Sequence, residues 1–136
     1  NHPKTSRFLG LARETNNYKP IWCVEKINNA KLDFQIKNGI EPKTALMGLS
    51  FKPDIDDLRE SPALEIVNQV VKNNKTNHYI VEPNISRHDK YTLSDYKTAS
   101  SNADIVVFLV GHKEFKTLDL SQKIVIDFCG ITQNHR

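Results

Sequence analysis

The residues best suited to chemistry lie in one polar stretch, 50–61 (SFKPDIDDLRES), directly after a short apolar run. Lys52 and Arg59 supply positive charge there, and Phe51 offers a ring that can pack on a base or a sugar. The stretch leads into a helical pattern at Ser61, and the free N–H groups and dipole of a helix N-terminus favour an anion. These residues predict a binding site for an anionic small molecule.

A second interpretation of the same stretch is a solvated loop whose cations pair with its own carboxylates. Those carboxylates belong to Asp54, Asp56, Asp57 and Glu60. They disfavour a pure phosphate cradle, because like charges repel, but they could hold the basic side chains in fixed orientations. The residues alone leave both interpretations open.

The remaining nucleophiles and metal ligands are scattered along the chain. Cys23 lies beside Trp22 in a helical segment and is expected to pack, while Cys129 follows the last strand and could face a ligand. An inert thiol is the expected state of both, because neither has a base nearby in sequence. The five histidines are isolated, and most are expected at the surface: His2, His78, His88, His112 and His135. We therefore expect no catalytic residue and no metal site in this chain.

Composition argues against several classes of function. The chain has 136 residues, room for one domain of ordinary size. Its 19 basic and 16 acidic residues give a formal charge of +3, too mild for a nucleic-acid-binding arm. No apolar run approaches the roughly 20 residues of a membrane helix and no signal peptide is visible, so no membrane partner is expected. Two distant cysteines are typical of a cytoplasmic protein, and the missing initiator Met suggests a fragment.

Apolar periodicity predicts alternating helices and strands. Helices are expected over 3–17, over 20–38, from Pro62 to Asn73–Asn74 and over 94–101, and strands over 43–49, 78–82, 104–110 and 123–127. Continuous apolar strands separated by helices are typical of a parallel sheet covered on both faces, so the fold class is α/β, a Rossmann-like domain. The second helix either links two domains or lies on the surface of this one. Gly48 stands alone at the first strand, without a G-x-G-x-x-G fingerprint, so this domain is not expected to be the main NAD site.

Residues 48–63 (GLSFKPDIDDLRESPA) closely resemble the G-x-x-F-K-x-x-x-x-D-x-R-x-S-P signature of the UDP-glucose/GDP-mannose dehydrogenase family. The sequence of residues 54–63 is most similar to the branch of the family that acts on UDP-N-acetylmannosamine. Residues 12–22 are similar to the end of the family's central helical domain. Glu82-Pro83 and the segment 127–130 resemble its Asp-Pro and closing motifs. The resemblance covers nearly the whole chain.

The resemblance implies an NAD-dependent oxidation of the C6 alcohol of a UDP-N-acetylhexosamine to a carboxylate, for polysaccharide precursors. In such enzymes a cysteine carries the thiohemiacetal and thioester, and an N-terminal domain binds most of the NAD; both would lie upstream of this chain. Residues 1–39 would be the end of the central dimerisation domain with a linker helix, and 40–136 the UDP-sugar-binding domain of a homo-oligomer. Phe51 and Lys52 would contact the UDP-sugar, and Arg59 would reach NAD.

One departure from the family pattern keeps other functions open. The family commonly places a Lys or Arg after the last strand, where this chain has Cys129, so the site lacks one cation unless Lys123 or Arg136 substitutes. The alternatives are a UDP-glucose 6-dehydrogenase, a non-catalytic nucleotide-sugar-binding module or degenerate remnant, and a generic α/β regulatory domain without affinity for UDP.

Overall fold

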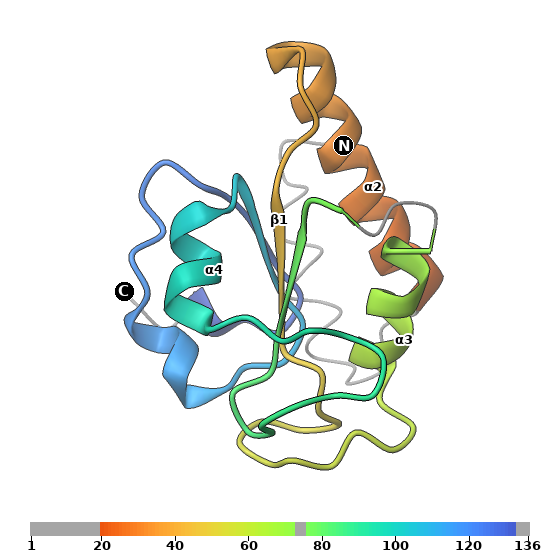
Figure 1. Cartoon of the computed structure of the whole chain (residues 1–136). Helices are drawn as coiled ribbons and strands as arrows, with labels where there is room; N and C mark the ends of the chain where they lie inside the picture. The colour runs from red at the N-terminus through yellow and green to blue at the C-terminus, as the bar shows by residue number, and fades with distance from the viewer. Residues whose placement is uncertain (1–19, 73–75, 133–136) are drawn as a thin grey trace.

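A parallel sheet between two helical layers forms the centre of the computed structural model, which describes residues 20–72 and 76–132 (Figure 1). The strands are β1 (Thr44–Met47), β2 (His78–Val81), β3 (Ile105–Phe108) and β4 (Ile124–Asp127). The helices are α2 (Pro20–Asn38), α3 (Pro62–Val70) and α4 (Tyr96–Asn102), with a 3-10 helix η1 (Lys113–Thr117). The sheet order is β2-β1-β3-β4 and all neighbours run parallel. The expected α/β class is confirmed.

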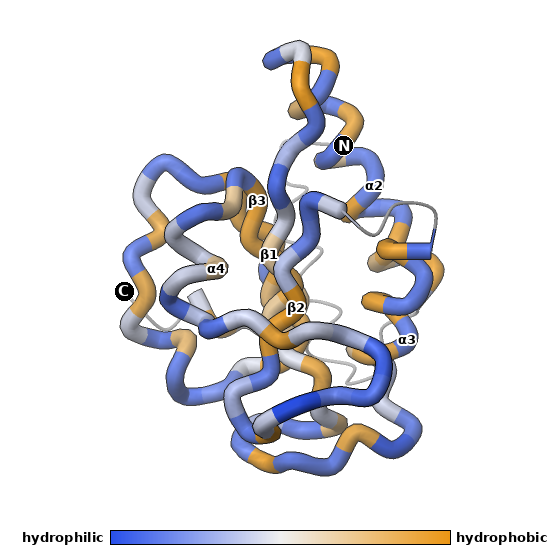
Figure 2. The backbone as a smooth tube through the Cα atoms, viewed as in Figure 1, coloured by the Kyte–Doolittle hydropathy of each residue, from blue (hydrophilic) through white to orange (hydrophobic). Residues whose placement is uncertain are grey.

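Side chains on the two faces of the sheet build two separate cores. On β1, Leu46 packs on the face covered by α2 and α3, whereas Ala45 and Met47 pack on the face covered by α4 and η1. This alternation follows from the two-residue period of a strand. Figure 2 shows the apolar colour gathered along the central strands. Both faces are buried, as a parallel sheet requires.

Helix α2 begins at Pro20, as expected from a proline at the first helical position. Its first half covers the sheet, because Cys23 and Ile27 are fully buried in the core shared with α3. Its second half exposes Leu32 and Ile36 and extends past the sheet in Figure 1. The first half therefore behaves as a helix on the surface of this domain, while the division at residue 39 stays a prediction.

Several expected boundaries differ from the structure. Helix α3 ends at Val70 rather than at Asn73–Asn74, because Lys72 N–H donates to Gln69 O and tightens the last turn. Strand β3 ends at Phe108, since Leu109 and Val110 N–H both donate to Met47 O and the regular ladder stops there. The helix expected over 3–17 lies outside the described residues. Within the described ranges, no helix has the length and apolar character to cross a bilayer.

Candidate functional site at the carboxyl ends of the strands

The strand order brings the ends of three strands together. β2 and β3 flank β1, so the residues that follow them converge where the chain leaves β1. Ser50 follows β1, Glu82 follows β2 and His112 follows β3, and all three are buried. The loop 50–60 extends from this point at the lower edge of the sheet in Figure 1. Ligands of open α/β sheets bind at this carboxyl edge.

Glu82 ties the ends of β1 and β2 together. Its Oε1 accepts the N–H groups of Leu49 and Ser50 at 2.8 and 3.0 Å, and its Oε2 accepts that of Asn84 at 2.8 Å. Burial acts to raise the pKa of Glu82, but the hydrogen bonds from His112, Leu49 and Asn84 outweigh it and hold the pKa below its ordinary value. Glu82 is therefore a buried carboxylate at neutral pH.

His112 brings the end of β3 into the same network. The surface position expected for most histidines is wrong here, because the His112 side chain is 0% exposed. Its Nε2 lies 2.9 Å from Glu82 Oε1, and its Nδ1 accepts the N–H of Asp54 at 2.8 Å. Glu82 and His112 follow separate strands, so only the three-dimensional sheet order shows that they meet. The signal in the sequence is that each comes within two residues of the end of an apolar run.

Phe51 and Lys52 lie at the solvent side of this buried network. Phe51 is 48% exposed, and Lys52 Nζ lies 5.8 Å from the centre of its ring. The backbone around them is fixed, because Phe51 N–H donates to Asp57 O at 2.7 Å and Ser50 Oγ donates to Lys52 O at 2.7 Å. A ring and an ammonium group are thus held side by side and open to solvent. Such a pair can stack on a base or sugar and meet a phosphate charge.

Arg59 pairs with a carboxylate of its own loop. Its Nε and Nη2 donate to the two oxygens of Asp57 at 3.0 and 2.9 Å, and its side chain is 88% exposed. These hydrogen bonds lower the pKa of Asp57 to about 2. For Arg59, the structure agrees with the interpretation of a solvated loop whose cations pair with its own carboxylates. A guanidinium has five N–H donors, so the pair still leaves donors for a further anionic partner.

The sequence matches the UDP binding domain of the UDP-glucose/GDP-mannose dehydrogenase family over residues 45–134. The chain belongs to this family. It is 38% identical to a UDP-N-acetyl-D-mannosamine dehydrogenase of Yersinia pestis over 96% of this chain and 34% of that protein. It is 40% identical to an NDP-N-acetyl-D-galactosaminuronic acid dehydrogenase of Ralstonia nicotianae over 95% of this chain and 31% of that protein. The chain thus spans about a third of the length of these relatives.

Solved structures of dehydrogenases share the fold. A UDP-glucose dehydrogenase from Pyrobaculum islandicum superposes with a TM-score of 0.64 at 20% identity, over 84% of this chain and 27% of that one. A UDP-N-acetyl-mannosamine dehydrogenase from Staphylococcus aureus superposes with a TM-score of 0.60 at 23% identity, over 82% of this chain and 27% of that one. At these identities the likeness shows the fold alone.

The helix that follows the family signature offers fewer N–H groups to an anion than the sequence suggests. Pro62 has no N–H, and Leu64 N–H donates to Ser61 Oγ at 3.2 Å. Glu65 N–H donates to Ser61 O at 3.2 Å. Ser61 acts as the expected N-cap and occupies one of the N–H groups that an anion could use.

The family's closing motif is a turn organised by Asp127. Its Oδ1 accepts the N–H groups of Cys129, Gly130 and Ile131, and its Oδ2 accepts Thr132 N–H at 2.8 Å. Burial raises the pKa of Cys129, and the charge of Asp127 adds to this effect. Cys129 is therefore a protonated thiol beside the carboxyl edge, in agreement with the inert role expected for it.

Lys123, one of the two substitute cations proposed for the position of Cys129, does not lie at this site. Lys123 Nζ donates to Ser101 O and Ala103 O, both at 2.7 Å. These carbonyls lie before β3, and Lys123 itself precedes β4, so the ammonium caps the amino edge of the sheet. The prediction that Lys123 replaces the cation missing at Cys129 is therefore wrong. Arg136 lies outside the described residues.

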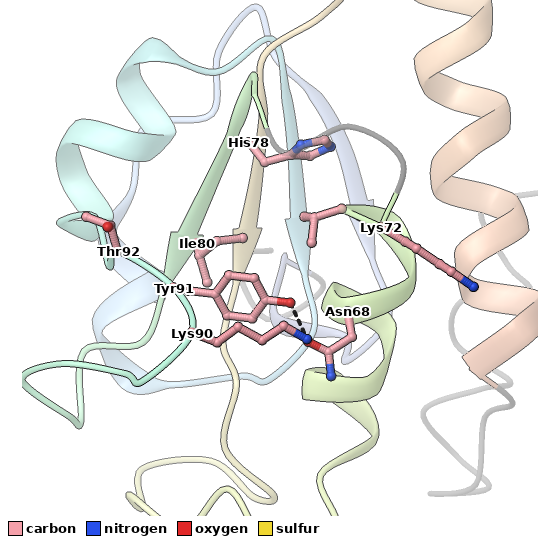
Figure 3. Close-up of a pocket in the computed structure, with 8 residues that line it drawn as sticks. Asn68, Lys72, His78, Ile80, Lys90, Tyr91 and Thr92 are labelled. Carbon is pink, nitrogen blue, oxygen red and sulfur yellow. Dashed lines mark hydrogen bonds between the residues drawn. The ribbon is translucent and has the colours of Figure 1, made fainter.

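Two recesses are lined by residues other than Phe51 and Lys52. One of about 410 Å³ opens between α3 and β2, where Tyr91 and Lys90 both point to Asn68 (Figure 3). The other, of about 560 Å³, lies between the starts of α2 and α3 and borders the end of the loop 50–60. The first contains His78, the opening residue of β2, so it is not at the carboxyl edge where sheet ligands bind. In the ranges that the structure describes, no three His, Cys, Asp or Glu side chains form a metal-holding group.

Proposed function

We propose that this chain is the C-terminal UDP-sugar-binding part of an NAD-dependent UDP-N-acetylhexosamine 6-dehydrogenase that oxidises the C6 alcohol to a carboxylate for surface polysaccharide precursors. Membership of the family supports this proposal, as do relatives named for N-acetyl-D-mannosamine and N-acetyl-D-galactosaminuronic acid. UDP-N-acetylmannosamine is the substrate that we favour, since several of these relatives carry its name. The chain's share of those relatives leaves the rest of such an enzyme outside it.

The observation that carries the proposal is the exposed Phe51–Lys52 pair at the carboxyl end of β1. The ring provides a stacking surface and the ammonium a counter-charge for a diphosphate. Both are anchored through Ser50, which Glu82 holds in the sheet edge. A site of this kind binds the UDP group that all UDP-sugars share, so the identity of the sugar would depend on residues beyond this chain.

Arg59 is the residue that we assign to NAD. NAD supplies the hydride acceptor of such an oxidation when it is bound. The exposed guanidinium fits a single contact with an anionic cofactor, because Asp57 fixes its orientation through two N–H groups and leaves others available. One contact cannot hold a dinucleotide, so the greater part of the NAD site would belong to another domain.

A non-catalytic nucleotide-sugar-binding module is the second candidate. The missing cation at Cys129 favours it, because the family commonly has a Lys or Arg there and Lys123 is held at the amino edge of the sheet instead. Turnover of UDP-N-acetylmannosamine with NAD by the native gene product would exclude this candidate, whereas UDP binding without turnover would establish it.

The domain organisation that we propose follows the family. Residues 1–39 would be the end of a central helical dimerisation domain with its linker helix, in a cytoplasmic enzyme that forms a homo-oligomer. The exposed apolar side chains of Leu32 and Ile36 in the second half of α2 support a neighbour on that side.

The experiment that tests UDP binding compares two lysines by calorimetry. Lys52→Ala should weaken UDP binding at least about tenfold, which corresponds to roughly 1.4 kcal/mol. Lys37→Ala is the matched control, because Lys37 is an exposed lysine in the last turn of α2, before β1. Equal loss in both variants would show unspecific charge attraction, and no loss in Lys52→Ala would reject the assignment.

A further inference from the structure

We propose that His112 is a positioning residue, which holds the Phe51–Lys52 segment in place through a neutral ring that links Glu82 to Asp54; this rests on the UDP-binding function proposed above. His112 does not reach solvent and so cannot touch a ligand at the loop surface. Its effect on binding would act through the loop backbone alone.

The tautomer of His112 follows from its partners. A backbone N–H can only donate, so Nδ1, which accepts Asp54 N–H at 2.8 Å, carries a lone pair. Asn84 Nδ2 lies 3.2 Å from the same nitrogen and is a second donor. The ring proton is therefore on Nε2, where it is donated to Glu82 Oε1 at 2.9 Å, with Ser50 Oγ 3.3 Å away. The ring is neutral and both nitrogens are used.

The ring fixes the far side of the loop. Asp54 has a φ of 63°, in the left-handed region that aspartate tolerates better than most residues. Its N–H is held by His112 Nδ1, and its Oδ1 accepts Lys113 N–H at 2.8 Å. Asp54 is thus bound at two points to the turn after β3. Since Ser50 is bound to Glu82 at the near side, the segment 51–53 is held at both ends.

The local structure around His112 shows that its ring is not needed for capping. It occupies the N-cap position of η1 but makes no side-chain capping hydrogen bond there. The ring packs edge-on against Phe115, with centroids 5.4 Å apart, which orients it toward the loop. The two ring nitrogens of His112 therefore bond to Glu82 and to the backbone of the loop.

Two conservative substitutions test the hydrogen bonds of His112 Nδ1 and Nε2 one at a time. His112→Asn places an amide oxygen near the position of Nδ1, so it can still accept Asp54 N–H but gives Glu82 no donor. His112→Gln places an amide N–H near the position of Nε2, so it can still donate to Glu82 but leaves Asp54 N–H without its acceptor. UDP affinity by calorimetry and Tm by thermal unfolding are measured for both variants and the wild type.

If His112 acts by positioning the loop, the variant with the weaker UDP binding should be the one with the higher Tm. His112→Gln should weaken UDP binding about tenfold with the smaller fall in Tm, and His112→Asn should bind UDP within about twofold of wild type despite the larger fall. Affinity that follows Tm, or UDP binding unchanged in His112→Gln, would overturn the inference. Absence of UDP binding in the wild type would instead reject the proposed function.

A measurement on the wild-type chain covers the case in which a variant does not fold. Long-range ¹H–¹⁵N correlation spectra of the imidazole distinguish the two neutral tautomers. The inference requires the Nε2–H form and a slowly exchanging Asp54 amide in the free protein. A ring protonated on Nδ1, or a rapidly exchanging Asp54 amide, would contradict it without any substitution.

Discussion

Glu82 Oε1 and His112 Nε2 lie 2.9 Å apart, and both side chains are fully buried. The two residues are 30 positions apart and follow different strands, on either side of β1. This hydrogen bond joins the ends of β2 and β3 across the start of the loop that carries Phe51 and Lys52. The proposed UDP site therefore depends on a polar network beneath it.

Removal of the Glu82 carboxylate should destabilise the fold. Glu82→Ala would leave the N–H groups of Leu49, Ser50 and Asn84 and the ring of His112 without their acceptor. A buried donor without a partner costs about 1–3 kcal/mol, so we expect the free energy of unfolding to fall by roughly 3 kcal/mol in chemical denaturation. Glu25→Ala, at an exposed position of α2, is the control and should change little. Equal effects in the two variants would contradict the role of the network.

The lowered pKa of Glu82 predicts a pH dependence of stability. A carboxylate whose folded pKa is depressed stabilises the fold above its ordinary pKa, and this stabilisation is lost as the pH falls from the ordinary toward the depressed value. Wild type should therefore lose stability on acidification more steeply than Glu82→Gln, which cannot titrate at this position. Denaturation curves over about pH 7 to 3 give the difference. Parallel curves would show that Glu82 titrates normally.

Arg59 and Lys52 should affect different ligands. In the proposed full-length dehydrogenase, Arg59→Ala should raise KM for NAD and leave the affinity for UDP within about twofold, because Arg59 pairs with Asp57 and not with the Phe51–Lys52 segment. Lys52→Ala should have the opposite pattern. Steady-state kinetics with each ligand varied in turn separates the two, and a change in the same parameter for both variants would reject the separate roles.

Both cysteines should resist thiol reagents in the native chain. Burial raises the pKa of Cys23 to about 12, and burial with the charge of Asp127 raises that of Cys129, so little thiolate exists at neutral pH. Titration with a chromogenic disulfide should show slow reaction of both until the chain is unfolded. One equivalent that reacts at once would identify an activated thiol and would reopen a nucleophilic role.

Local patterns in the sequence were enough to predict most of the fold. Pro20 and the Ser61–Pro62 pair predict the starts of α2 and α3, because a proline at the first helical position and a serine cap are local features. The apolar runs predict the four parallel strands for the same reason. The same patterns place the ends of α3 and β3 too late, because hydrogen bonds at those ends decide where an element stops.

The buried network was not predictable from the same patterns. His112 reads as an isolated histidine in the sequence, and its burial depends on a carboxylate that only the sheet order brings to it. The composition of the loop does not decide whether Arg59 pairs with Asp57. Both residues are in one segment, and the choice between a free and a paired cation depends on side-chain rotamers. The roles of Phe51, Lys52 and Arg59 remain predictions from the family resemblance.

The measurement that tests the central claim most directly is a titration of the ¹⁵N-labelled chain with UDP, followed by amide chemical shifts. UDP binding at the carboxyl edge predicts saturable shifts concentrated at residues 50–54 and at Asn84, with little change at Asn68 and Tyr91 in the recess of Figure 3. Shifts confined to Asn68 and Tyr91 would place the nucleotide elsewhere. No shifts at millimolar UDP would contradict a UDP-binding role for this chain.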